Sequence, residues 1–482
     1  MKTSRLFALP LLLLAQLNVS AQNSTKEKIT QVENGLFGTT QIEGEALWTI
    51  RERMAYYKVP GLSIAVIQNY RVVWAKGYGF ANDSSKTPVT TQTLFQAGSI
   101  SKSLNAVGIL KLVQDKKLDL YADINAYLTD WKFPYDSLSK GKRITMANLL
   151  SHSAGLNLQG FGGYLPGKPL PTIVQVLNGE KPANSPRVHS MFEPGLRFQY
   201  SGGGTIISQL MVMDITHRNY AEYMKNEVLM PLGMKSSTFA QPPVDVNPAL
   251  LANAYNMAGN PVPGKFHVYP EQAAAGLWTN PTDLAKYVIE IQLAYAGKST
   301  KVLKQATAKL MLTPYIGGFP GLGVFINKQD GITYFSHPGV DAGFHSNYTA
   351  SVEGGNGVIV MVNGDNDQLL AEVTNSVAKV YDFKGIFKIN VKKVIALPTD
   401  RLQTYTGEFE LTPQRVLTIF TEDGHLYLRA TGETKRELYA QSETRFFLRD
   451  LPYELEFLPD TTGKAKLVLY ADEGKHDLKR IK

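Results

Sequence analysis

The sequence predicts an α+β fold, in which an antiparallel sheet is flanked by helices and accompanied by a helical subdomain, with an all-β, barrel-like domain at the C-terminal end. Two observations predict it. Strand-length apolar runs precede and follow a long helical region, and beyond residue 398 the pattern changes to short alternating strands. At 482 residues the chain also exceeds one ordinary domain.

The first residues are typical of a secretory signal peptide. Lys2 and Arg5 precede the apolar run Leu6–Ala15, and Val19-Ser20-Ala21 has the small residues of a cleavage site. The run is too short for a membrane span, which needs about 20 residues. We therefore expect residues 1–21 to be removed, and the mature protein to be periplasmic or secreted without an integral membrane segment.

Residues 22–390 are expected to form the larger domain. A short helix at Leu47–Lys58 precedes a hairpin built from Leu62–Ile67 and Val72–Tyr78. Helices and long Gly/Pro-rich loops follow to about residue 312, and such loops are often functional. Four more strands form an antiparallel meander, Leu322–Asn327, Ile332–His337, His345–Val352 and Val358–Asn363, before an amphipathic helix that carries Leu369, Leu370, Val373, Val377 and Val380 on one face.

A linker is expected at residues 391–398 and a separate β domain at 399–482. Asp423-Gly424 is a strong two-residue turn signal between Val416–Thr421 and His425–Ala430. About eight short strands fit this segment, which favours a small closed sheet or barrel.

The composition argues against several kinds of site. The chain has no cysteine, so disulfides and thiolate chemistry are excluded. The histidines do not pair at metal-ligand spacing and no H-E-x-x-H occurs, so we expect neither a metal nor a cofactor. No G-x-S-x-G is present. The formal charge of +8 is dispersed, so nucleic acid is not an expected partner.

One serine–lysine pair stands where a turn becomes an apolar helix. In this stretch Ser99 and Lys102 lie one helical turn apart on one face, and Gly98 permits a close approach of other backbone. S-x-x-K is weak alone, because it recurs in a polar loop and in the final amphipathic helix, where we expect surface residues. These other pairs are Ser137/Lys140, Ser139/Lys142 and Ser376/Lys379.

The pair suits nucleophilic catalysis. A hydroxyl is a poor nucleophile until a base takes its proton, and burial together with the helix dipole would disfavour an ammonium at Lys102. The backbone amide of Ser99 could donate to a developing oxyanion. The ordinary alternatives are a helix N-cap for Ser99 and, for Lys102, a charge that reaches solvent along its apolar stem.

Two further stretches complete a recognisable set, FQYSGGG (Phe198–Gly204) and FSHPGVDAGFHS (Phe335–Ser346). With S-x-x-K before them, they resemble the motifs of the serine β-lactamase and penicillin-binding-protein superfamily, in its class C and D-aminopeptidase-like branch. Family-like phrases accompany them, and the resemblance spans about Leu47 to Phe383. These phrases are LLSHSAGL, EPGLRFQYS and MPLGMKSSTF.

The resemblance implies that Ser99 is the acylated nucleophile and that Lys102 and Tyr200 share the proton transfers. Which of these two is the base in acylation stays open. His337 would replace the lysine of the third motif and offer a donor near the substrate carboxylate or the Tyr200 hydroxyl. The amide of Val340 would join that of Ser99 in the oxyanion hole. The ordinary alternatives are that Tyr200 is a packed core residue and that His337 is a strand-end residue whose hydrogen bonds are satisfied locally.

Gly202 departs from the family pattern, which has asparagine there. The glycine removes a side chain that contacts the acylamide of the substrate, a loss of about 1–3 kcal/mol if its partner is buried. Gly202 and Gly339 are the substrate-contact candidates. The departure favours an ester or another D-configured amide over a β-lactam.

The expected function is therefore that of an exported serine hydrolase acting on D-amino-acid peptides, esters or cell-wall-related fragments. A penicillin-binding sensor with little turnover, a β-lactamase or esterase, and an envelope adhesion module built on the C-terminal domain are the alternatives. That domain resembles the lipocalin-like domain of D-aminopeptidase-like relatives, in YTGEFEL (Tyr405–Leu411) and SETRFFLRD (Ser442–Asp450). It would narrow the active site or serve stability alone. No feature of the sequence specifies an oligomeric state.

Overall fold

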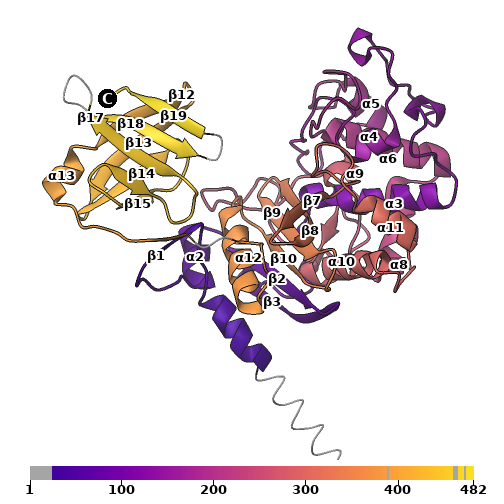
Figure 1. Cartoon of the computed structure of the whole chain (residues 1–482). Coiled ribbons are helices and arrows are strands. Elements are labelled where there is room, and N and C mark those ends of the chain that lie inside the picture. Colours follow the sequence, from indigo (N-terminus) through magenta and orange to yellow (C-terminus); the bar gives the residue numbers. More distant parts are fainter. Residues whose placement is uncertain (1–23, 388–389, 460–464, 472–473) are drawn as a thin grey trace, which may run out of the picture. The chain divides into compact units, whose positions relative to one another are not determined.

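The computed structural model describes residues 24–387, 390–459, 465–471 and 474–482. The predicted signal peptide lies outside these ranges. By its internal contacts the chain divides into two compact units (Figure 1), one formed by Met54–Leu370 and the other by the residues up to Arg53 together with Ala371–Lys482. The domain boundaries drawn from the sequence remain predictions, whereas the α+β class is confirmed.

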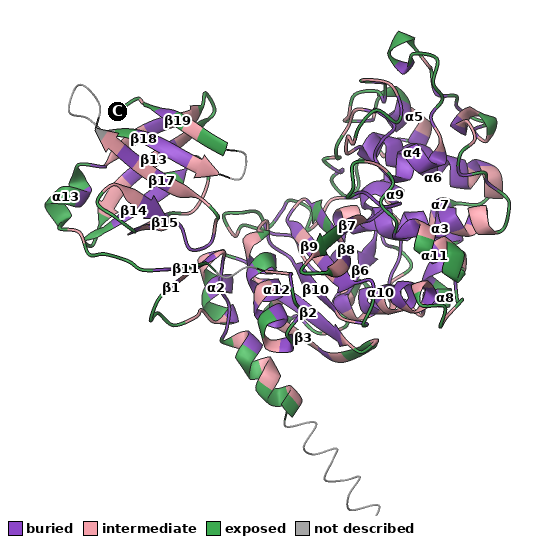
Figure 2. Ribbon diagram, viewed as in Figure 1, coloured by how far each residue is buried: buried purple, intermediate pink, exposed green. Residues whose placement is uncertain are grey.

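A seven-stranded antiparallel sheet is the frame of the larger unit, in the order β4-β3-β2-β10-β9-β8-β7. The predicted hairpin and meander are both present. Helix α10 (Pro281–Tyr295) packs against β2, β3 and β10, and the strands β2 and β10 are buried almost throughout (Figure 2). The strands are β2 Gly61–Gln68, β3 Arg71–Asn82, β4 Thr87–Pro88, β7 Phe325–Gln329, β8 Ile332–Asp341, β9 Phe344–Ser351 and β10 Gly357–Val362.

Helices form the rest of this unit. Two largely buried helices, α3 (Ser101–Gln114) and α6 (Gly202–Thr216), pack together, and both contact the short helix α9 (Gln272–Ala275). Their burial on most sides is what the even distribution of apolar residues in their sequences predicts. Smaller helices surround them: α4 Met146–Leu150, α5 Ile173–Asn178, α7 Tyr220–Met224, α8 Met230–Leu232 and α11 Gln305–Met311.

The other unit contains a closed eight-stranded barrel, as the C-terminal pattern predicts. Apolar side chains including Phe409, Phe446 and Phe457 fill its core. The predicted turn at Asp423-Gly424 joins β13 to β14. The strands are β12 Gly407–Thr412, β13 Arg415–Glu422, β14 His425–Ala430, β15 Arg436–Ala440, β16 Arg445–Phe447, β17 Glu454–Pro459, β18 Ala465–Ala471 and β19 Gly474–Arg480.

The N-terminal segment belongs to the same unit as the barrel. Its strand β1 (Thr40–Ile42) pairs in parallel with β11 (Asn390–Lys392). Arg53, in α2 (Ile50–Tyr56), makes a buried ion pair with Glu372 of α12 (Gln368–Tyr381), with 2.6 Å between Nη2 and Oε1. Ser376 of α12 is fully buried and donates to the carbonyl oxygen of Val32, so the sequence-based prediction that it lies on the surface is wrong. A further short helix, α13 (Thr399–Gln403), precedes the barrel.

No helix in the described part of the chain is long and apolar enough to cross a membrane.

Candidate active site

Ser99 lies in a 3-10 turn, η1 (Gly98–Ile100), immediately before α3. Strand β5 (Phe95–Gln96) pairs with β6 (Trp278–Thr279), and the Ala97 amide donates to the Leu277 carbonyl oxygen at 2.8 Å. These bonds fix the turn beside α9. The N-cap residues are Ala97 for η1 and Ile100 for α3, and neither helix has a side-chain capping bond. The interpretation of Ser99 as an N-cap is therefore wrong, and its hydroxyl is available to another partner.

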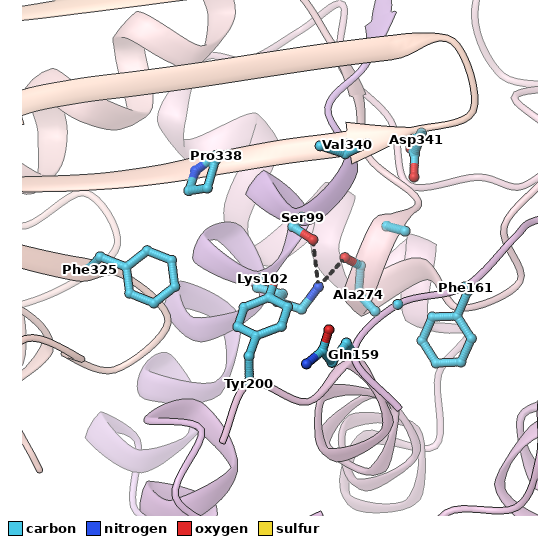
Figure 3. A pocket seen from close by; sticks show the side chains of 12 residues that line it. Ser99, Lys102, Gln159, Phe161, Tyr200, Ala274, Phe325, Pro338, Val340 and Asp341 are labelled. Atoms are coloured by element: carbon cyan, nitrogen blue, oxygen red, sulfur yellow. Dashed lines mark hydrogen bonds between the residues drawn. The ribbon is translucent and has the colours of Figure 1, made fainter. Parts of the chain in front are cut away.

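That partner is Lys102. Its ammonium nitrogen Nζ lies 2.9 Å from Ser99 Oγ and 2.8 Å from the carbonyl oxygen of Ala274 in α9 (Figure 3). The lysine is only 3% exposed, so the alternative of a charge that reaches solvent is also wrong. The spacing of three residues on one helix thus gives a direct contact between the two functional groups.

Two glycines allow strand β8 to approach the serine turn. A Cβ atom at Gly339 would lie 1.9 Å from the Ala97 carbonyl oxygen, and one at Gly98 would lie 2.5 Å from the Val340 nitrogen. Gly98 also has φ +51°, which side chains disfavour. The contact brings the backbone of Val340 next to the turn that carries Ser99. Neither Gly339 nor Gly202 is among the residues that line the cavity.

Tyr200 lies on the loop that precedes α6, and a second histidine holds it there. The ring of His152 packs against the Tyr200 ring at a tilt of 39°, with 4.3 Å between centroids. His152 Nδ1 accepts from the Ser201 amide at 3.2 Å, and its carbonyl oxygen accepts from the Gln199 amide at 2.7 Å. Lys102 Nζ lies 5.1 Å from the centre of the Tyr200 ring. His152 therefore clamps the backbone on both sides of the tyrosine.

His337 is 1% exposed, and its ring stacks on Phe325 with 4.9 Å between centroids. Its Nδ1 donates to the Pro338 carbonyl oxygen at 2.6 Å, while Nε2 has no partner among the described residues. Burial, assisted by the charge of Lys102, lowers the pKa of His337 to about 3. In this neutral tautomer Nε2 is an acceptor, whereas the sequence analysis expected a donor. The Tyr200 and His337 ring centroids are 6.3 Å apart.

A loop occupies the space that opens at Gly202. A Cβ atom there would lie 2.9 Å from the Phe161 ring and 3.0 Å from the Gln159 carbonyl oxygen. Gln159 lines the cavity, and Figure 3 shows its side-chain amide next to Tyr200 and the Lys102 amine. An amide is therefore present near the position where the family asparagine is missing, supplied by another segment.

The assembled cavity has a volume of about 590 Å³. Its lining includes the polar groups of Ser99 and Lys102 and apolar side chains such as Phe161 and Phe325. Asp341, at the end of β8, adds a carboxyl group (Figure 3). The lining residues are Ser99, Lys102, Gln159, Gly160, Phe161, Tyr200, Ala274, Ala275, Phe325, Pro338, Val340 and Asp341. Sequence reasoning missed Gln159 and Asp341, although both stand within four residues of phrases that resemble the family, LLSHSAGL and H-P-G.

Within the described ranges, no group of three or more His, Asp or Glu side chains is arranged to hold a metal ion.

Comparison with known proteins agrees with this arrangement. Residues 49–381 match the family model named Beta-lactamase, and residues 391–479 match a domain of unknown function, DUF3471. The chain is 24% identical to penicillin-binding protein 4* of Bacillus subtilis over 440 residues, which are 85% of this chain and 93% of that protein. It is also 24% identical to protein flp of Staphylococcus aureus strain MW2 over 63% of this chain and 60% of flp.

Solved structures share the fold. The octameric penicillin-binding protein homologue from Pyrococcus abyssi aligns with a TM-score of 0.62 at 24% identity, covering 89% of this chain and 98% of that one. SurE aligns with a TM-score of 0.57 at 19% identity, covering 90% and 97% of the two chains.

Proposed function

Because the chain belongs to the beta-lactamase family, whose model matches residues 49–381, we propose that it is a serine hydrolase that forms an acyl-enzyme at Ser99. The substrates are small amides or esters, foremost D-amino-acid peptides and cell-wall-related fragments. The observation that carries the proposal is the 2.9 Å contact between Ser99 Oγ and a buried Lys102 amine at the wall of a cavity.

In the proposed reaction Ser99 Oγ attacks the substrate carbonyl carbon while its proton passes to one base, either the Lys102 amine or the Tyr200 phenolate. The carbonyl oxygen gains negative charge, which the backbone amides of Ser99 and Val340 stabilise by donating hydrogen bonds. The C–N or C–O bond then breaks and the leaving group receives the proton. A water molecule attacks the acyl-enzyme and regenerates the serine.

Other residues have supporting roles in this proposal. His152 is a positioning residue that orients Tyr200, and Phe325 forms the wall beside it, supported by the neutral His337 ring that stacks on it from outside the cavity lining. Gln159 supplies the amide contact to the acyl group that Gly202 cannot make. Gly339 acts through the backbone, because it allows the Val340 amide to reach the oxyanion. The signal peptide predicted from residues 1–21 supports the proposal that the protein is exported to the periplasm or the cell exterior.

The test is hydrolysis of a short-chain nitrophenyl ester, with fluorophosphonate labelling measured by mass spectrometry. We expect Ser99→Ala to abolish both, with one label per parent chain. Hydrolysis by Ser99→Ala at the parental rate would exclude the proposed nucleophile. A matched control is Ser139→Ala, since Ser139 starts another S-x-x-K pattern and is not among the residues that line this cavity.

A second candidate is a penicillin-binding sensor with little turnover, which the missing asparagine at Gly202 favours. Mixing the protein with a penicillin discriminates the two. A stable penicilloyl adduct at Ser99, without hydrolysis of ester substrates, supports the sensor. Rapid turnover of esters or D-aminoacyl amides supports the hydrolase.

A further inference from the structure

A row of aromatic side chains continues from the wall of the cavity to the surface of the larger unit. Phe325 lines the cavity and is half-buried. The Phe319 ring stacks on it, with 5.9 Å between centroids and 28° between the ring planes. Phe198 meets both rings edge-on, with its centroid 4.6 Å from that of Phe319 and 6.3 Å from that of Phe325. Phe319 is 40% exposed, so this aromatic row (Phe325, Phe198 and Phe319) ends in a face that a ligand can reach.

The backbone holds the exposed ring in place. The Phe319 carbonyl oxygen accepts from the Ile326 amide at 2.6 Å, and the Pro320 carbonyl oxygen accepts from the Tyr315 amide at 2.8 Å. An isolated β-bridge joins Pro320 to Phe325, the first residue of β7. The position of the Phe319 ring therefore does not depend on burial of the ring itself. Fixed aromatic surfaces that adjoin a cavity are typical of small-molecule binding sites.

The aromatic row lies on the side of the cavity where the proposed reaction places the leaving group. Figure 3 shows Phe325 and Phe161 on opposite sides of the Tyr200 ring. The acyl group is assigned to the side of Gln159 and Phe161. The leaving atom takes its proton from Tyr200 or Lys102, and the Tyr200 ring centroid is 6.3 Å from that of Phe325. The leaving group therefore faces Phe325.

This side of the cavity has no free donor for a charged leaving group. Pro338 lines it and has no amide hydrogen. His337 donates its Nδ1 hydrogen to the Pro338 carbonyl oxygen, which leaves only an acceptor at Nε2. Among the residues that line the cavity Lys102 is the only base, and its ammonium is already bonded to Ser99 Oγ and to the Ala274 carbonyl oxygen. A carboxylate would lose its hydration here without gaining a partner.

We propose that the aromatic row is a leaving-group subsite, so that the bond cleaved joins the acyl group to an uncharged aromatic alcohol or amine whose ring packs on Phe325 and extends over Phe319. This inference rests on the proposed function and narrows it to esters and amides whose leaving group carries no carboxylate. Attack by Ser99 releases the aromatic alcohol or amine together with the serine proton, and water then releases the acid. Aromatic rings gain stacked or edge-on contacts with such a surface.

The test compares three acetate esters that share one acyl group: phenyl, 4-biphenylyl and 3-carboxyphenyl acetate. Each kcat/KM is divided by the rate constant for alkaline hydrolysis of the same ester, which removes differences in chemical reactivity. We expect the wild type to prefer the biphenylyl over the phenyl ester by about 5- to 20-fold, because the second ring is buried against Phe319. The carboxyphenyl ester should be about 10-fold or more below the phenyl ester, because its charge is desolvated without a partner.

Substitution of the exposed ring tests the assignment to Phe319. In Phe319→Ala the ratio of biphenylyl to phenyl ester should fall to about 1–2, and Phe319→Leu, which keeps apolar bulk without a ring, should also lower it. The ratio is informative because damage to the serine machinery lowers both rates together. The matched control is Val72→Ala, since Val72 is an apolar residue 36% exposed on β3, and β2, β10, β9 and β8 lie between β3 and β7. It should keep the parental ratio.

Two results would overturn the subsite while leaving the hydrolase proposal intact. One is a wild-type ratio of biphenylyl to phenyl ester that is near 1 or that persists in both Phe319 variants. The other is hydrolysis of the carboxyphenyl ester as fast as that of the phenyl ester. If none of the esters is hydrolysed, the proposed function fails, and calorimetric binding of 4-phenylphenol decides the subsite. Binding at least about 5-fold tighter to the wild type than to Phe319→Ala supports it, and equal or undetectable binding overturns it.

Discussion

Replacing Glu271 by glutamine should stabilise the protein, and the gain should grow with pH. The carboxyl group is buried and has no partner among the other described residues, so burial raises its pKa from 4.5 to about 7, against the smaller opposing effect of its own backbone amide. At pH 4 the acid is protonated in the folded and the unfolded chain, and the substitution changes little. Between pH 4.5 and 7 the unfolded chain releases the proton first, so the folded chain holds more protons and loses stability as the pH rises.

The size of the effect follows from the two pKa values. They differ by about 2.5, and each pKa unit corresponds to 1.36 kcal/mol, so the parent loses about 3 kcal/mol of unfolding free energy by pH 8. Glutamine removes this loss and keeps the shape of the side chain. A gain of this size raises the Tm by roughly 5 °C in a unit of this length.

Calorimetric unfolding at pH 4, 6 and 8 measures the difference between Glu271→Gln and the parent. Tryptophan fluorescence identifies the relevant transition, because Trp74, Trp131 and Trp278 belong to the unit that contains Glu271. Glu353→Gln, at an exposed acid on the turn between β9 and β10, is the matched control and should show no pH-dependent gain. A difference that does not change between pH 4 and pH 8, or a variant destabilised at every pH, would refute the reasoning.

Four other substitutions test separate parts of the structure. Lys102→Met should slow fluorophosphonate labelling of Ser99 by about 10²- to 10⁴-fold, and labelling at the parental rate would contradict a role in proton transfer. Gly339→Ala should lower ester kcat/KM by about 10²-fold, because its Cβ displaces β8 and the Val340 amide. Gly162→Ala is the control, with nothing within 4 Å of its Cβ, and equal rates in the two variants would count against this packing argument. Gln159→Ala should lower kcat/KM by about 5- to 10-fold for an amide-bearing acyl group and less for a plain acyl ester. An equal loss for both substrates would contradict the proposed contact between Gln159 and the acyl amide. Glu372→Ala should cost about 3–5 kcal/mol of unfolding free energy by removing the carboxylate that contacts the buried Arg53 guanidinium, as chemical denaturation can measure, and a parental value would contradict it.

The parts of the fold that the sequence predicted depend on local patterns. Alternating apolar residues and glycine turns specify the strands of the meander and of the barrel, because a strand exposes alternate side chains to one face. The contact between Ser99 and Lys102 was predictable for the same reason, since helical geometry alone brings residues three apart together. Such features do not require knowledge of which distant segment packs against them.

The residues that were missed depend on such distant segments. Glu271 stands in an irregular stretch with no periodic pattern, and Gln209 from the distant helix α6 holds the residues on both sides of it. Ser376 was assigned to the surface because serine is polar and lies in the middle of an amphipathic helix. Its burial depends on the contact with Val32, which lies near the N-terminal end of the chain. Strand β8 continues to Asp341, beyond its predicted end at His337, because β9 pairs with it to that point.

Gly202 shows why one departure from a motif is hard to interpret alone. The sequence suggests that the asparagine was lost and nothing replaced it. In the folded chain the Gly202 amide donates to the Gln159 carbonyl oxygen at 3.3 Å, and the Phe161 ring closes over the space that a side chain would need. The glycine and the loop therefore depend on each other, since an asparagine at residue 202 would require the loop to move. The change in the motif and the placement of Gln159 are best understood as one adaptation of the acyl-binding wall, which acts through two segments about 40 residues apart.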